Sequence, residues 1–216
     1  MMSLGGSVII PSATDQIDFS YLKAFKKLIA SIRHKKFVIA TGGGSTARKY
    51  MKVLEQEGFD KKIQCLMGIS VTRLHAKFMA DFFDGMSSQS IPRSVQEVKG
   101  LLKKNKVVFV GGLRYEEDNT SDGTAARIAQ HLKTDFINIT DVEGLYTKDP
   151  RKHKDAKLYS SLTYDEAIEK HLEVMDQAAF SLCRDQKLPI VVFNFQDRSN
   201  LMKAATGKKV GTLIHG

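Results

Sequence analysis

Short apolar runs alternate along the chain with longer stretches in which apolar residues recur every three or four positions. The continuous runs predict strands, and the three- and four-residue spacing predicts helices. The predicted strands are residues 37–40, 107–110, 136–139 and 189–194. The predicted helices are residues 18–35, 45–57, 66–83, a segment from 121 or 122 to 132 capped by Ser121 or Asp122, a segment opened by the capping box Thr163-x-x-Glu166, and residues 174–187.

This order of elements predicts an α/β fold. Strands separated by helices form βα units, and the nearly continuous apolar strands are typical of a sheet that is buried on both faces. We therefore expect a three-layer αβα sandwich with a mostly parallel central sheet. Ligands of such open sheets bind beyond the carboxyl ends of the strands.

Composition narrows the class of protein. The 216 residues are 42% hydrophobic and carry a formal net charge of +9, which excludes a disordered chain and favours an anionic partner. The two cysteines, Cys65 and Cys183, form no C-x-x-C pair, which suits a reducing cytosol, so we expect a cytoplasmic protein. No apolar run approaches the roughly 18–20 residues of a membrane span.

Glycine and small polar residues gather in four loops. Glycines let backbone N–H groups approach an anion, and a helix N-terminus adds a favourable dipole. Arg48 lies one turn into the helix after the second loop, within reach of the same anion. The loops are Gly5-Gly6-Ser7, Gly42-Gly43-Gly44-Ser45, residues 111–122 and residues 140–150.

Several familiar site motifs are missing from the sequence. It contains no G-x-x-x-x-G-K-[ST], no H-E-x-x-H or paired Cys/His metal pattern, and no G-x-S-x-G. Gly42-x-Gly44-x-x-Ala47, followed by Asp60, matches the loose dinucleotide-binding fingerprint. That fingerprint should open the first βα unit, whereas here another glycine-rich turn precedes it.

Together the four loops resemble the uridylate (UMP) kinase branch of the amino acid kinase superfamily. The most specific parts are Gly42-Gly43-Gly44 with Arg48, Thr120-Ser121-Asp122, and residues 141–150. The resemblance covers nearly the whole chain; the first half is more similar to archaeal members and the second half to bacterial ones. It implies one domain over residues 1–216, with an acceptor-binding part roughly at 1–130 and an ATP-binding part roughly at 131–216.

The resemblance also implies roles for individual residues. Asp122 matches a carboxylate that organises phosphoryl transfer, and Mg²⁺ is expected with ATP, although no metal ligand is assigned. The implied ATP-binding residues are Gly5, Gly6, Gly44, Arg48, Thr140, Asp141, Tyr146 and Asp149. The implied UMP-binding residues are Gly43, Cys65, Tyr115, Glu116, Glu117, Asp118, Asn119, Thr120 and Ser121. Cys65 stands where family members usually carry an Asp that binds the ribose hydroxyls.

The implied activity is transfer of the ATP γ-phosphoryl group to UMP by a homo-oligomer, expected to be a hexamer, with small-molecule substrates rather than nucleic acid or membrane. The apolar helix at 66–83 is either a subunit interface or ordinary core. Only residues 1–4 precede Gly5, so the first strand is either unusually short or truncated. Open alternatives are a related kinase with another acceptor, a non-catalytic nucleotide- or oxyanion-binding member, and a nucleic-acid- or dinucleotide-binding protein.

Overall fold

The computed structural model describes the chain except residues 12–13, 116–119, 141, 151, 173–174 and 195–196. The strands are β1 (Met2–Leu4), β2 (Phe37–Thr41), β3 (Val107–Val110), β4 (Phe136–Thr140), β5 (Ser161–Thr163), β6 (Ile190–Asn194) and β7 (Thr212–His215). The helices are α1 (Gly6–Ile9), α2 (Phe19–Ser31), α3 (Gly44–Gln56), α4 (Lys61–Phe82), α5 (Val95–Lys104), α6 (Ser121–Leu132), α7 (Tyr164–Glu169), α8 (Gln177–Asp185) and α9 (Arg198–Ala205).

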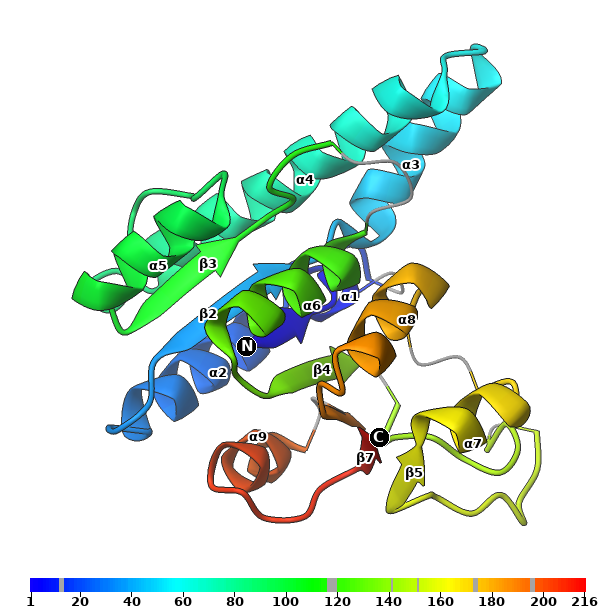
Figure 1. Cartoon of the computed structure of the whole chain (residues 1–216). Coiled ribbons are helices and arrows are strands. Elements are labelled where there is room, and N and C mark those ends of the chain that lie inside the picture. Colours follow the sequence, from blue (N-terminus) through cyan, green and yellow to red (C-terminus); the bar gives the residue numbers. More distant parts are fainter. Residues whose placement is uncertain (12–13, 116–119, 141, 151, 173–174, 195–196) are drawn as a thin grey trace.

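The seven strands form one sheet in the order β3-β2-β1-β4-β6-β7-β5 (Figure 1). Every neighbouring pair is parallel except β6 and β7, which are antiparallel. β1 lies between β2 and β4, with Met2 opposite both Ile39 and Ile137. The predicted mostly parallel sheet is confirmed, and the short first strand is an interior strand of it.

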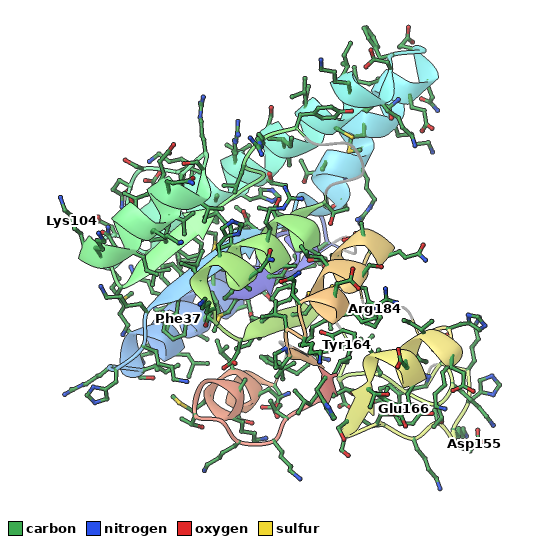
Figure 2. The ribbon with its side chains drawn as sticks, in the orientation of Figure 1. Phe37, Lys104, Asp155, Tyr164, Glu166 and Arg184 are labelled. Atoms are coloured by element: carbon green, nitrogen blue, oxygen red, sulfur yellow. The ribbon has the colours of Figure 1, made fainter. Side chains whose placement is uncertain are left out.

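Helices cover both faces of the sheet, as predicted. Side chains alternate across each strand, so Ile39 and Phe109 enter the core under α2, α4 and α9, while Val38 and Val108 enter the core under α5, α6, α7 and α8. In Figure 1, α6 and α8 lie in front of the sheet. Tyr164, which is labelled in Figure 2, closes the second core near the carboxyl end of the chain. The centre of its ring lies 5.2 Å from the centre of the Phe180 ring.

Several element boundaries differ from the prediction. α4 begins at Lys61, five residues earlier than expected, because the Asp60 side chain accepts a hydrogen bond from the Ile63 N–H and caps the helix there. α2 ends at Ser31 instead of residue 35. The N-cap of α6 is Thr120, whose hydroxyl accepts from the Gly123 N–H, and not Ser121 or Asp122. The hydrophobic pattern does not predict α1, α5, α9, β5 or β7.

The face of α4 that carries Leu66 and Leu74 points to solvent: these side chains are 43% and 63% exposed. The buried face carries smaller and more polar residues, among them Thr72 and His75. Figure 1 shows α3 and α4 packed together and extending beyond the sheet. The apolar segment 66–83 was expected to be either a subunit interface or ordinary core. The exposure of Leu66 and Leu74 shows that this outer face is not core. No helix in the described part of the chain has the length and apolar character to cross a membrane.

Candidate active site

A cavity of about 250 Å³ lies at the carboxyl ends of β1, β2 and β4. This is the sheet edge at which the sequence predicts a ligand. Both glycine turns reach it, as does the beginning of α6. Its lining residues are Ser3, Gly5, Gly6, Ser7, Gly42, Gly43, Gly44, Arg48, Ser121, Asp122, Asn138, Ile139 and Thr140.

The two glycine turns pack backbone against backbone. The Gly42 N–H donates to the Leu4 carbonyl at 2.9 Å. A Cβ atom on Gly6 would lie 2.2 Å from the Gly44 nitrogen, and Gly44 itself has a φ of +59°. A side chain at Gly6 would therefore force the turns apart.

The second glycine turn is also the N-terminus of α3. Its N-cap residue, Gly43, has no side chain that could accept from the first N–H groups of the helix, so these groups are left for an anion or water. Arg48 lies one turn further and lines the same cavity. The Ser45 hydroxyl, in the first turn, is buried without a hydrogen-bond partner in the part of the chain that the structure describes.

Asp122 supplies the carboxylate of the cavity. The Ser3 hydroxyl, from β1, donates to its Oδ1 at 2.6 Å. Burial raises the pKa of Asp122; the Ser3 hydrogen bond opposes this rise, and the nearby Asp176 carboxylate adds to it. Asp176 is the N-cap of α8 and accepts from the Thr120 hydroxyl, so it ties α8 to the beginning of α6.

The residues expected on the acceptor side are only partly gathered at this cavity. Gly43 and Ser121 line it, whereas Cys65, Tyr115 and Thr120 do not. The Lys62 ammonium lies 5.9 Å from the centre of the Tyr115 ring. Cys65 follows Lys62 by three residues along α4 and therefore shares the helix face that approaches the segment after β3. The predicted residues Glu116, Glu117, Asp118 and Asn119 lie outside the described residues.

The residues expected around the adenine nucleotide are spread more widely. Thr140 lines the cavity, but Tyr146 and Asp149 lie beyond it. The Tyr146 hydroxyl donates to Glu143 Oε2 at 2.5 Å, and this bond raises the pKa of Tyr146 to about 12. The Asp149 carbonyl accepts from the N–H groups of the turn that follows it. The predicted Asp141 lies outside the described residues.

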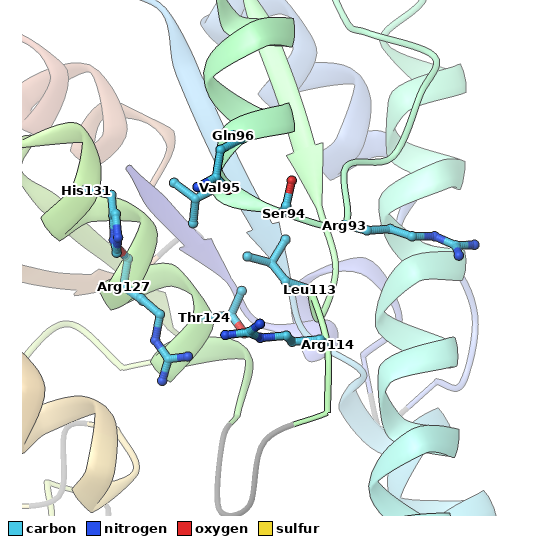
Figure 3. Close-up of a pocket in the computed structure, with 9 residues that line it drawn as sticks. All are labelled: Arg93, Ser94, Val95, Gln96, Leu113, Arg114, Thr124, Arg127 and His131. Carbon is cyan, nitrogen blue, oxygen red and sulfur yellow. The ribbon is translucent and has the colours of Figure 1, made fainter.

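A second cavity, of about 240 Å³, lies between α5, α6 and the segment after β3 (Figure 3). Arg114 and Arg127 extend on the side of Thr124, while Arg93 points away toward α4. Among the described residues, no predicted site residue lines it. The backbone N–H of Arg93 donates to the Glu97 carboxylate at the beginning of α5.

Sequence reasoning missed several polar residues that hold the site in place. Ser3 supports Asp122, Asp176 holds Thr120, and Thr72, Arg73 and His75 of α4 bond to the two turns after β2 and β3. One signal was available: Thr72 and His75 are three residues apart on the same face as Val71 and Met79. A polar side chain on a buried face must have a partner. Over the described residues, no three His, Cys, Asp or Glu side chains form a metal cluster.

The model of the amino acid kinase family matches residues 2–194. This chain belongs to the amino acid kinase family. One relative is the uridylate kinase of Thermoplasma volcanium, which is 36% identical over 96% of this chain and 93% of that protein. Another is the uridylate kinase of Corynebacterium diphtheriae, which is 31% identical over 99% of this chain and 93% of that protein. Among solved structures, uridylate kinase from Archaeoglobus fulgidus is similar, with a TM-score of 0.84, 30% identity, and coverage of 99% of this chain and 98% of that one.

Proposed function

We propose that this chain transfers the γ-phosphoryl group of ATP to UMP, giving ADP and UDP. One observation carries the proposal: a single cavity joins two glycine turns, an arginine and a partly buried carboxylate at the carboxyl ends of three neighbouring strands. Phosphoryl transfer depends on positioning and charge neutralisation more than on covalent chemistry. Relatives named uridylate kinase that match nearly the full chain support UMP as the acceptor.

The phosphates of ATP fit the glycine-lined part of the cavity. The backbone N–H groups around Gly5, Gly6 and Gly44 donate to the phosphate oxygens, and the Arg48 guanidinium balances their charge. Thr140, Asp141, Tyr146 and Asp149 hold the rest of the nucleotide beyond the end of β4. These donors are fixed before the substrate arrives, so little reorganisation is needed during the transfer.

Mg²⁺ accompanies ATP in this proposal. Magnesium is usually held by one or two carboxylates together with the phosphates of the substrate. Asp122 fits this requirement, because its carboxylate lines the cavity and, among the described residues, only Ser3 forms a hydrogen bond with it. When bound, the cation neutralises charge on the phosphates. The Ser3 hydrogen bond holds the Asp122 carboxylate in the wall of the cavity.

UMP occupies the side of the cavity that faces α4 and the beginning of α6. Gly43 and Ser121 contact it at the cavity, and Tyr115, Thr120 and Cys65 contact the part of UMP that extends beyond the cavity. Glu116, Glu117, Asp118 and Asn119 are assigned to UMP by the family resemblance alone. A thiol is a weak hydrogen-bond acceptor compared with a carboxylate. A second candidate function therefore rests on Cys65: the chain phosphorylates an acceptor other than a ribonucleotide.

Assembly and location complete the proposal. We expect a homo-oligomer, a hexamer, in which the exposed apolar face of α4 contacts another subunit, and a cytoplasmic location. Ile63, Leu66, Met67 and Leu74 are 38% to 63% exposed and recur at helical spacing along that face. Removing such a row from water favours association.

The deciding experiment is a coupled assay of ADP release with Mg·ATP. The acceptors are UMP, dUMP, CMP, AMP, GMP, acetylglutamate and isopentenyl phosphate. Turnover with UMP well above that with CMP, AMP, GMP, acetylglutamate and isopentenyl phosphate supports the proposal, and faster turnover with one of these five moves the chain to the second candidate. Absence of turnover from protein that binds ATP would indicate a binding role.

The same assay tests the importance of Cys65 for acceptor choice. UMP and dUMP differ only in the ribose 2′-hydroxyl, which a carboxylate at position 65 can bind. We expect wild type to discriminate weakly between the two, and Cys65→Asp to favour UMP more strongly. Cys65→Ala is the matched control, because it removes the thiol without adding an acceptor. Equal discrimination by all three proteins would place the ribose away from α4.

A further inference from the structure

One turn of α4 forms hydrogen bonds with both the glycine turn after β2 and the glycine turn after β3. The Thr72 hydroxyl accepts from the Gly112 N–H at 2.8 Å, and Arg73 donates through Nε to the Gly112 carbonyl at 2.8 Å. His75, one turn along and only 4% exposed, contacts the other loop. Its Nδ1 lies 2.7 Å from the Gly42 carbonyl oxygen.

The direction of this hydrogen bond is fixed by its acceptor. A carbonyl oxygen has no proton to give, so the proton must sit on Nδ1 of His75. The Gly42 carbonyl belongs to the peptide that links Gly42 and Gly43, and this peptide is trans. In a trans peptide the C=O and the N–H point in opposite directions. Anchoring the Gly42 oxygen on α4 therefore directs the Gly43 N–H away from α4.

The three consecutive glycines make such an anchor necessary. A glycine without Cβ accepts both signs of φ at little cost, so the peptide between Gly42 and Gly43 is easily rotated. Rotation by half a turn would present the carbonyl oxygen, in place of the N–H, to an anion in the cavity. The Gly43 N–H forms no hydrogen bond within the described residues, which leaves it for a ligand.

We propose that His75 is a positioning residue for phosphoryl transfer. It holds the Gly42–Gly43 peptide with its N–H toward the acceptor phosphate, and it thereby also fixes the adjoining Gly44 N–H, the first of α3, toward the ATP phosphates. His75 lies on the opposite side of that peptide and does not touch the substrate. The inference rests on the proposed kinase activity for its kinetic test. Its binding test needs only Mg·ATP.

Three substitutions separate the hydrogen bond from the packing. His75→Asn places Nδ2 on the same carbon, Cγ, that carries Nδ1 in histidine, so the donor is kept. His75→Leu fills a similar space without a donor. His75→Gln moves the amide one bond further and places its donor away from the Gly42 oxygen. Tyr164→Phe is the matched control for lost stability, because it removes another buried hydrogen bond, to the Leu188 carbonyl, in the carboxyl-terminal half.

We expect His75→Leu and His75→Gln to lower kcat by about 10- to 100-fold, the effect of displacing reacting groups by roughly 1 Å. The same two variants should bind Mg·ATP more weakly in calorimetric titration without UMP. His75→Asn should restore both properties, and Tyr164→Phe should lower Tm without changing either. The contrast between His75→Asn and His75→Leu is the readout that general destabilisation does not produce.

Two results would overturn the inference. One is wild-type kcat and Mg·ATP affinity in His75→Leu. The other is an equal loss in His75→Asn and His75→Leu that follows their loss of Tm. If the wild type binds Mg·ATP but does not phosphorylate UMP, the proposed function fails, whereas the titrations still decide the role of His75.

Discussion

Asp122 combines the negative charge that the proposed function needs with a setting that disfavours it. Burial raises the pKa of its carboxyl group, and the Asp176 carboxylate on the α8 side, near Cys183, raises it further. The hydrogen bond from the Ser3 hydroxyl on the β1 side favours the charged form and lowers the pKa. A carboxyl group whose pKa is higher in the folded state binds its proton more tightly there. Its ionisation therefore reduces stability as the pH rises above the unfolded value of about 3.9.

This conflict predicts opposite effects of Asp122→Asn on activity and stability. The amide oxygen still accepts from Ser3, but the charge is gone, so we expect turnover of Mg·ATP with UMP to fall by about 100-fold or more. In buffer without Mg²⁺ or nucleotide, the urea midpoint at pH 7 should equal or exceed that of wild type. The advantage should shrink as the pH falls through the raised pKa. A lower midpoint at pH 7 would show that the carboxylate is stabilised by partners beyond Ser3.

Gly6 marks the closest approach of the two glycine turns. Because an added Cβ would meet the Gly44 nitrogen at 2.2 Å, Gly6→Ala should separate the turns and weaken Mg·ATP binding at least tenfold by calorimetry. Gly100→Ala is the control: nothing lies within 4 Å of its Cβ position in α5. That change should stabilise the protein by about 0.5–1 kcal/mol. Unchanged Mg·ATP affinity in Gly6→Ala would mean that the turns do not hold the phosphates.

At the scale of elements, the sequence predicts what depends on local pattern. The apolar runs identify β2, β3, β4 and β6, and the glycines identify the turns that follow β1 and β2. The support of the site is not local: Ser3 and Asp122 are 119 residues apart, and His75 reaches Gly42 across 33. α5 has a short and weakly apolar pattern, so it was not predicted, although Ser94-x-x-Glu97 has the same spacing as the capping box that predicts α7.

α4 links the site to the proposed subunit contact, because its inner face holds the turns and its outer face is apolar and exposed. We predict that Leu66→Lys combined with Leu74→Lys weakens self-association, since each lysine would have to be desolvated in the interface. Ile168→Lys on α7, with the same 43% exposure as Leu66, is the control. Light scattering after size-exclusion chromatography gives the mass of each protein. A monomeric wild type, or a double variant of unchanged mass, would contradict the prediction.

At the scale of the whole molecule, the acceptor and ATP parts share their cores. β1 pairs with β2 on one side and with β4 on the other. The core under α2 and α4 also contains Ile139 and Phe193, and the core under α6 and α8 contains residues from Val38 to Ile214. The expected boundary near residue 130 therefore does not separate hydrophobic cores, and the acceptor-binding and ATP-binding parts remain a proposed division of function.

This shared packing predicts that the chain unfolds in one cooperative transition. Cys183 is fully buried in the core of α8 and reports on the carboxyl-terminal half through its reaction with a thiol reagent, while far-UV circular dichroism reports on the whole chain. In urea the two midpoints should coincide. Mg·ATP should raise both midpoints together, because at a ligand concentration of 100 Kd it raises the free energy of unfolding by about 2.7 kcal/mol. Cys65→Ser leaves Cys183 as the only thiol and keeps the readout specific. Labelling of Cys183 at lower urea than the loss of helix signal would show that the ATP-binding half opens on its own, and the single-domain prediction would be wrong.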